Sequence, residues 1–227
     1  MNVAIIAAAG RGTRMAGKRP KQFLELGGTP IVFHTLKPFE QCDSIHEVIV
    51  VLPAEESAGF LSLAGRAGLR KLARVVSGGE TRAESVARGL SAVRGATAEI
   101  IAVHDGVRPF VTPGEINGVV EAAKSTGAAV LVAPMTDTIK EVKDGYIVST
   151  LDRTSLRRSL TPQCFRYDIL RRAYEGIDLH DPALTDDSFL VEQLGIKVAL
   201  VEGSPRNIKI TNAEDLHIAE ALLKLSQ

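Results

Sequence analysis

The feature that most constrains this chain is a continuous apolar run, residues 3–9 (VAIIAAA), which ends at Gly10. The run is too short to cross a bilayer, and it lacks the basic lead of a signal peptide. A short apolar run that stops at glycine is typical of a central parallel strand buried on both faces. Because such a strand needs helices on both sides of its sheet, the run predicts an α/β fold.

The rest of the chain alternates strand and helix patterns. Strands are predicted at 47–52, 73–76, 100–103, 128–133 and 197–201, and helices at 30–42, 54–67, 81–94, 113–125, 167–174, 186–194 and 212–225. This alternation predicts a Rossmann-like, mostly parallel twisted sheet with helices on both faces. The length of 227 residues fits a single α/β domain covering residues 1–227.

One segment, at about 138–152, interrupts the alternation. It is polar and contains Asp144-Gly145, a strong signal for a hairpin turn. The flanking sequences KEVK and YIVSTL are too polar for a core. We therefore expect a protruding β-hairpin arm.

Composition narrows the classes of partner. Lys plus Arg and Asp plus Glu both number 27, so the formal net charge is zero. A nucleic-acid or membrane surface would need a basic excess, so neither partner is expected. The two cysteines, Cys42 and Cys164, lie far apart and have no metal-like spacing. A disulfide framework is therefore not expected, and a reducing, cytoplasmic location fits.

A cluster of cations follows the first strand, at the end where open parallel sheets bind ligands. Glycines in this loop let backbone N–H groups close on a phosphate. The five cations are Arg11, Arg14, Lys18, Arg19 and Lys21. In a protein without net charge, this density and position predict a phosphate site rather than a solvated basic loop.

Two familiar phosphate loops do not match this segment. A dinucleotide fingerprint needs a third glycine where the chain has Met15, and an acid about twenty residues on, where it has Thr29-Pro30. A Walker loop needs Gly-Lys-Ser/Thr after a four-residue gap, and the sequence has none. The phosphate site is therefore of another kind.

The third predicted strand leads into Gly78-Gly79-Glu80-Thr81-Arg82, with Ser85 three residues later. Glycines and a hydroxyl at a helix start form a natural site for an anion or the edge of a base. The same residues also serve as an ordinary helix cap, and both interpretations stay open on the residues alone.

Asp105 follows the fourth predicted strand, with Arg108 close behind it. A single carboxylate there is a plausible Mg²⁺ ligand, because Mg²⁺ often takes only one or two protein carboxylates plus phosphates and water. The neighbouring His104 is expected to be structural. Lys209 adds a cation after the last predicted strand, although a lone exposed lysine is usually only solvated.

The segments AAAGRGTRM and PKQF resemble the opening signature of the sugar nucleotidyltransferases. Further segments follow in order over nearly the whole chain: GGETRAESVARGL, VHDGVRPF, DTIK, DRTSLRRSLTPQCF, TDD and NIKIT. The ordered set resembles the 2-C-methyl-D-erythritol 4-phosphate cytidylyltransferases of the non-mevalonate isoprenoid pathway. The opening signature is shared by many nucleotidyltransferases, whereas the ordered set is highly specific.

The resemblance implies a role for each matching residue. The residues that would wrap the CTP triphosphate and base are Ala8, Ala9, Gly10, Arg11 and Gly12. Those that would read cytosine are Gly79, Glu80 and Ser85. Those that would stabilise the transferring phosphate are Arg14, Lys21 and Lys209. Asp105 would bind Mg²⁺ or another divalent cation. The residues that would hold the acceptor, a small polyol phosphate, are Asp105, Arg108, Thr138, Arg153 and Thr185.

The implied acceptor contacts Thr138 and Arg153 lie at the two ends of the arm. An arm that leaves one subunit and reaches the active site of another would reconcile a polar, protruding segment with substrate contacts. We therefore expect a homodimer with arm exchange, and two-fold dimers are the commonest oligomers.

Rival interpretations remain at this stage. Ribitol-5-phosphate cytidylyltransferases share most of these motifs, so the acceptor stays open, with methylerythritol phosphate preferred. From other classes, a nicotinamide-dependent oxidoreductase or a non-catalytic nucleotide-binding module would suit the same sheet. The joint presence of Arg14, Lys21 and Asp105 favours catalysis.

Overall fold

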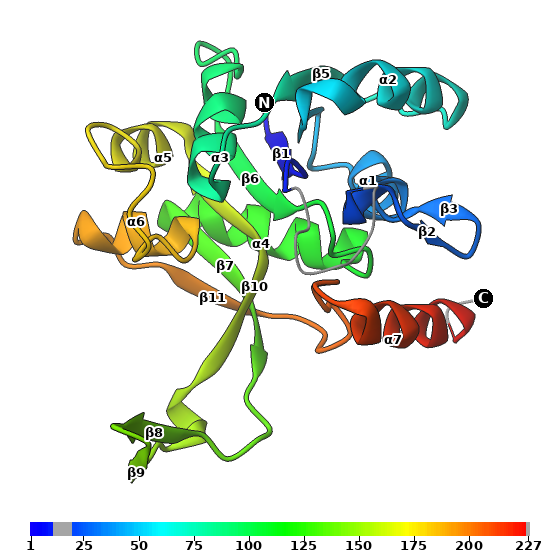
Figure 1. Ribbon diagram of the computed structural model, residues 1–227. Coiled ribbons are helices and arrows are strands. Elements are labelled where there is room, and N and C mark those ends of the chain that lie inside the picture. Colours follow the sequence, from blue (N-terminus) through cyan, green and yellow to red (C-terminus); the bar gives the residue numbers. More distant parts are fainter. Residues whose placement is uncertain (11–19, 226–227) are drawn as a thin grey trace.

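The computed structural model of the chain describes residues 1–10 and 20–225. Its main sheet is built from β1 (Val3–Ala7), β4 (Glu47–Leu52), β5 (Leu72–Ser77), β6 (Ile100–Asp105), β7 (Ala128–Pro134), β10 (Arg157–Arg166) and β11 (Ala199–Glu202). The strand order is β11-β7-β10-β6-β1-β4-β5. Every neighbouring pair is parallel except the two that involve β10 (Figure 1). The expected mostly parallel α/β sheet is confirmed.

The two faces of β1 belong to separate apolar clusters. Ala4 and Ile6 pack on the side covered by α1 (Ile31–Gln41), α2 (Ser57–Arg66) and α4 (Pro113–Thr126). Val3 and Ile5 pack on the side covered by α3 (Arg82–Ser91), α5 (Tyr167–Ala173) and α6 (Asp187–Gln193). All four side chains are fully buried, and each isoleucine contributes about 1.5–3 kcal/mol by leaving water. The expected burial of this strand on both faces is therefore confirmed.

A third, smaller apolar cluster joins the C-terminal helix to the body. It contains Leu26 of β2 (Glu25–Leu26), Ile31 at the start of α1, Ile210 in the segment before α7 (Ala213–Lys224), and Ala219 within α7. β2 pairs with β3 (Thr29–Pro30) in a short hairpin that the sequence did not predict. The cluster packs the segment before α7 against the loop after β6, which contributes Val107. A backbone hydrogen bond joins the same two segments, because Ile210 N–H donates to the carbonyl of Val107 at 2.9 Å.

Side-chain caps set the starts of several helices. Thr81 Oγ1 accepts from the backbone N–H of Glu84 at 3.0 Å and so begins α3. Asn212 caps α7 in the same way, as its position in the sequence predicted. Such caps are worth about 1 kcal/mol each. The cap at Thr81 also fixes where the loop between β5 and α3 ends.

Strand β10 is the one strand of the seven-stranded sheet that sequence reasoning missed. It lies between β6 and β7, antiparallel to both, and Gln163 pairs with Val103 of β6 and with Val130 of β7. Its pairing with β7 shifts between Ser159 and Gln163, around Pro162. A proline in a ladder removes an N–H donor and usually argues against a central strand, which is why the pattern of this segment did not reveal it.

The arm is confirmed as a β-hairpin of β8 (Lys140–Lys143) and β9 (Tyr146–Thr150), which pair with each other outside the main sheet. Asp144 and Gly145 at its turn have positive φ angles of 50° and 82°. Figure 1 shows the hairpin standing away from the body of the molecule. Unlike the polar arm expected, it carries a set of exposed apolar side chains, namely Val142, Tyr146, Ile147, Val148 and Leu151.

Candidate active site

A cleft of about 870 Å³ opens at the carboxyl ends of the central parallel strands. Its walls come from the residues after β1, the loop between β5 and α3, the end of β6, and the segment before α7. The lining residues are Ala7, Ala8, Ala9, Gly10, Lys21, Gln22, Gly78, Gly79, Glu80, Thr81, Arg82, Ser85, Arg88, Asp105, Val107, Lys209 and Thr211. This is where open α/β sheets bind their ligands.

Backbone contacts hold the strand ends together beneath the cleft. Ala8 N–H donates to Val51 O at 2.9 Å, and Gly106 N–H donates to Ala7 O at 2.8 Å. A Cβ on Gly106 would lie 2.5 Å from the Cβ of Ala8, so glycine is required for this close approach. Gln22 adds a side-chain bond from Nε2 to Ala8 O at 2.6 Å. The residue after the metal-ligand candidate thus packs directly on the predicted phosphate loop.

The loop before α3 is ordered by its own side chains. Ser85 Oγ accepts from Gly79 N–H at 3.1 Å and donates to Thr81 O at 2.9 Å. Glu80 N–H donates to the carboxylate of Glu84 at 2.8 Å. The loop therefore forms the ordinary helix cap that was one of its two interpretations, and it also lines the cleft.

Asp105 is the centre of charge in the cleft. It is 5% exposed and makes three ion pairs. Its Oδ1 lies 3.0 Å from Arg82 Nε, and its Oδ2 lies 3.3 Å from Arg108 Nε and 2.9 Å from Lys209 Nζ. Burial by itself would raise the pKa of Asp105, but the charges of Arg82, Lys209 and Arg108 outweigh it and hold that pKa far below its usual range. The carboxylate is therefore ionised.

His104 is structural, as the sequence led us to expect. It is fully buried, and its Nε2–H donates to Arg108 O at 3.1 Å while its Nδ1 accepts from Thr161 Oγ1 at 2.9 Å. The Thr161 hydroxyl in turn accepts from the backbone N–H of Asp105 at 3.2 Å. Burial lowers the pKa of His104 from 6.5 to about 4, so the ring is neutral at physiological pH.

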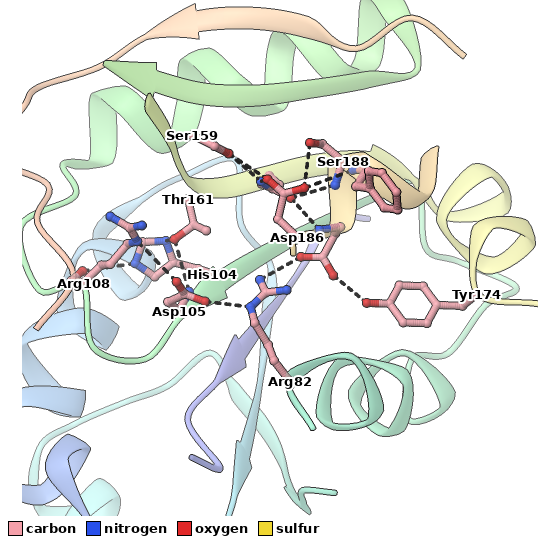
Figure 2. A network of polar contacts seen from close by, with 12 residues as sticks. Arg82, His104, Asp105, Arg108, Ser159, Thr161, Tyr174, Asp186 and Ser188 are labelled. Atoms are coloured by element: carbon pink, nitrogen blue, oxygen red, sulfur yellow. Dashed lines mark hydrogen bonds and ion pairs between the residues drawn. The ribbon is translucent and has the colours of Figure 1, made fainter. Parts of the chain in front are cut away.

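Sequence reasoning missed a second carboxylate behind the first. Arg82 places Nη2 2.8 Å from Oδ2 of Asp187, which is 0% exposed. Tyr174 donates its hydroxyl to Oδ1 of Asp187 at 2.6 Å. Figure 2 shows Arg82 lying between Asp105 and the α6 side of this network. The available signal was that Arg82 and Asp187 both stand in singled-out motifs at helix starts, GGETR and TDD.

Comparisons with known proteins show the family of the chain. The family model of 2-C-methyl-D-erythritol 4-phosphate cytidylyltransferase matches residues 2–225. The chain belongs to this family. A cytidylyltransferase of that name from Pelotomaculum thermopropionicum is 47% identical over 226 residues, which cover 99% of this chain and 94% of the relative.

Solved structures of family members share the fold. The 4-diphosphocytidyl-2C-methyl-D-erythritol synthase of Anaerococcus prevotii superposes with a TM-score of 0.86 at 30% identity, over 98% of each chain. The 2-C-methyl-D-erythritol 4-phosphate cytidylyltransferase of Thermus thermophilus gives a TM-score of 0.75 at 35% identity, again over 98% of each chain. The chain is therefore a nucleotidyltransferase enzyme, not an oxidoreductase or a non-catalytic module.

Most residues assigned by the family resemblance meet in one cleft. Those among its lining are Ala8, Ala9, Gly10, Lys21, Gly79, Glu80, Ser85, Asp105 and Lys209. Arg108 reaches it through its ion pair with Asp105. Arg11, Gly12 and Arg14 lie outside the described residues.

Besides Arg108, three of the expected acceptor contacts are not in that lining. Arg153 stands in a single 3₁₀ turn after the arm, where its Nη1 donates to Thr136 O at 2.7 Å. Thr138 is exposed before β8, and Thr185 is exposed just before α6. Within one chain the structure does not bring Thr138 and Arg153 to the cleft of the cytidylyltransferase.

The cleft suits a divalent cation that is shared with a nucleotide. Within residues 1–10 and 20–225 there is no group of three or more His, Cys, Asp or Glu placed to hold a metal. The described lining holds two carboxylates, Glu80 in the loop before α3 and the ionised Asp105 at the end of β6. With Asp105 as the ligand, phosphates and water would have to complete the shell. That is the mode of binding that Mg²⁺ favours.

Proposed function

We propose that the protein transfers the CMP part of CTP to 2-C-methyl-D-erythritol 4-phosphate, giving 4-diphosphocytidyl-2-C-methyl-D-erythritol and pyrophosphate. The observation that carries this proposal is the ionised Asp105 ringed by three cations in the strand-end cleft. A cleft of this kind suits two phosphorylated substrates and a metal. The names of the relatives supply the acceptor and the base.

The reaction needs little proton chemistry. A phosphate monoester has a second pKa of about 6, so the acceptor phosphate is already largely a dianion at neutral pH. One of its oxygens attacks the α-phosphorus of CTP in line, a new P–O bond forms, and the bond to the β-phosphate breaks with release of pyrophosphate. Neither a covalent intermediate nor a general base is required. The buried, neutral His104 is therefore left with a structural role.

The barrier is the approach of one anion to another, so catalysis rests on positioning and on cations. Lys21 and Lys209 line the cleft and, with Arg14, are the residues proposed to stabilise the charge on the transferring phosphate. Ala8, Ala9 and Gly10 stand at the end of β1 and, with Arg11 and Gly12, are proposed to wrap the triphosphate. For cytosine, the proposed contacts are Gly79, Glu80 and Ser85.

Asp105 is the residue proposed to hold Mg²⁺ or another divalent cation. When bound, the ion supplies charge neutralisation between the phosphates of the nucleotide. The chain's own part is to keep Asp105 ionised and aimed at the cleft, which its ion pairs with Arg82, Arg108 and Lys209 support.

We also propose a homodimer with arm exchange. Tyr146, Ile147 and Val148 on the arm are 77%, 65% and 54% exposed, and a cluster of exposed apolar side chains marks an interaction site. Thr138 and Arg153 stand at the base of the same arm, away from their own cleft. An arm that docks on a second subunit would add them to Arg108 and Thr185 as contacts for the acceptor phosphate.

The remaining assignments concern the whole chain. We propose a single domain of residues 1–227 that works in the cytoplasm. Cys42 and Cys164 are both buried and unbridged, which suits a reducing compartment. Among the described helices, none has the length and apolar character needed to cross a membrane.

The deciding experiment measures pyrophosphate release with CTP and each acceptor in turn. We expect turnover with 2-C-methyl-D-erythritol 4-phosphate and at least about tenfold lower kcat/KM with ribitol 5-phosphate. That difference corresponds to roughly 1.4 kcal/mol of transition-state binding. Preference for ribitol 5-phosphate would reverse the acceptor assignment, and turnover with neither would contradict the function.

A further inference from the structure

Arg82 is one of three cations paired with Asp105, and it alone of the three also pairs with a second carboxylate among the described residues. It is the first residue of α3, and its guanidinium places Nε 3.0 Å from Oδ1 of Asp105 and Nη2 2.8 Å from Oδ2 of Asp187. Asp187 is held by the Tyr174 hydroxyl at 2.6 Å, and its N–H donates to Gln163 Oε1 at 3.0 Å. Arg82 is thus anchored to the interior on one side and faces the cleft on the other (Figure 2).

The two oxygens of Asp105 differ in how firmly their partners are held. Oδ1 meets Arg82, whose second N–H is fixed by the buried Asp187. Oδ2 meets Arg108 at 3.3 Å, and this guanidinium also donates to Asn207 O at 2.9 Å. The second partner of Oδ2 is Lys209, whose side chain is 40% exposed. A lysine ammonium on a flexible stem is readily displaced, whereas a guanidinium bound at two points is not. Oδ2 is therefore the oxygen that can exchange a partner, Lys209, for a metal ion.

We propose that Arg82 is a positioning residue for the metal ligand: it fixes Oδ1 of Asp105 and so presents Oδ2 to the cation that accompanies the nucleotide. Asp187 and Tyr174 hold Arg82 in turn. The inference rests on the proposed function, because it takes Asp105 as the metal ligand. Outer partners commonly orient metal ligands, and their loss costs about 10–100-fold in metal affinity.

Charge alone predicts the opposite effect. In the ion cluster, Arg82, Arg108 and Lys209 face Asp105 and Asp187, which leaves an excess of one positive charge. Removing Arg82 cancels that excess, so a purely electrostatic view predicts tighter binding of a divalent cation. Positioning predicts weaker binding. The sign of the change therefore separates the two views.

The experiment titrates CTP into the enzyme by calorimetry, without acceptor, once in Mg²⁺ and once in EDTA. The ratio of the two Kd values is the coupling between metal and nucleotide. We expect Arg82→Gln to reduce this coupling by about tenfold or more and to leave the Kd in EDTA unchanged. Because CTP binds Mg²⁺ in solution equally for every variant, that contribution cancels.

Three further variants separate geometry from charge. The double variant Arg82→Gln/Asp187→Asn keeps the wild-type net charge of the cluster, and we expect the coupling to be lost all the same. Tyr174→Phe keeps every charge and should give a smaller loss in the same direction. Arg88→Gln is the matched control, since Arg88 also lines the cleft from α3 but pairs with Glu84 at 2.5 Å. In Arg88→Gln, any change in CTP affinity should be equal with Mg²⁺ and with EDTA.

Several results would overturn the proposal. Stronger coupling in Arg82→Gln would make Arg82 a competing counter-ion, and equal weakening in Mg²⁺ and EDTA would make it a direct nucleotide contact. Unchanged coupling would remove any role toward the metal. If Arg82→Gln does not fold, the double variant and Tyr174→Phe decide, and wild-type coupling in both would sink the idea. A wild-type enzyme without coupling would instead contradict Asp105 as the ligand.

Discussion

Lys209 and Asp105, which are 104 positions apart in the sequence, meet with Nζ 2.9 Å from Oδ2. The contact depends on the bond from Ile210 N–H to Val107 O, which joins the segment before α7 to the loop after β6. In this state the lysine neutralises the carboxylate. In the proposed reaction the same lysine serves the transferring phosphate, so it has to leave Asp105 when substrates arrive.

For Lys209→Ala, we expect kcat to fall by roughly 10²-fold, as when a charge-stabilising donor is lost. The KM for Mg²⁺ should stay level or fall, because Asp105 loses a competing cation. Steady-state assays over a range of Mg²⁺ concentrations measure both constants. A normal kcat together with a raised KM for Mg²⁺ would contradict this dual role.

For Lys21→Ala and Arg14→Ala, we likewise expect kcat to fall by roughly 10²-fold or more. Lys21 lies in a single 3₁₀ turn at the cleft, so its truncation should leave the sheet intact. Kinetic assays should be read beside circular dichroism, which checks folding. A folded variant with near-normal kcat would remove that residue from the mechanism.

For Asp105→Asn, activity should collapse, since the side chain keeps its shape but loses the charge that attracts Mg²⁺. Higher Mg²⁺ should recover part of the rate. The measurement is a Mg²⁺ titration of activity against the wild type. Full activity at low Mg²⁺ would show that the ligand lies elsewhere.

Stability in EDTA should depend on the pH through His104. Its folded pKa is lowered to about 4 by burial, whereas the unfolded ring titrates near 6.5. Between these values the unfolded state binds more protons, so stability is fully present above about pH 6.5 and falls as the pH drops toward 4. The loss amounts to on the order of 3 kcal/mol. Urea unfolding of wild type and His104→Gln across this range should give curves that converge at low pH, and parallel curves would refute the assignment.

Arm exchange predicts complementation between two inactive variants, Lys21→Ala and Arg153→Ala. In a mixed dimer with shared sites, one site carries both defects and the other carries neither. Activity should then return to at most about half the wild-type value per dimer, because each two-fold dimer has two sites. Verified heterodimers with no recovered activity would mean that each site is built from one chain, while the cytidylyltransferase activity would stand.

The sequence predicted the elements whose patterns are local. The apolar run at residues 3–9, the Asp144-Gly145 turn and the Asn212 cap each specify their structure through neighbouring residues. Strand β10 could not be found in this way, because its burial comes from insertion between β6 and β7 and its pattern is interrupted by Pro162.

The same distinction holds in the site. The glycines and cations that follow strands in the sequence predicted the cleft, because the carboxyl ends of parallel strands lie at the same edge of the sheet. The link from Arg82 to Asp187 was not predictable, because it joins two helix starts 105 positions apart through a guanidinium with two partners. Charge-pair geometry of this kind depends on three-dimensional packing rather than on spacing in the chain.

The place of β10 in the sheet also bears on how the chain is synthesised. β6 and β7 are both complete by residue 134, but the strand that joins them ends only at residue 166. During translation both strands therefore have open edges, which are templates for wrong pairing. At roughly 5–20 residues per second this exposure lasts on the order of seconds. A nascent chain stalled within the arm would hold three unpaired strand edges, one on β6 and two on β7, because β11 also follows the arm. It is in that interval that the protein most needs a chaperone.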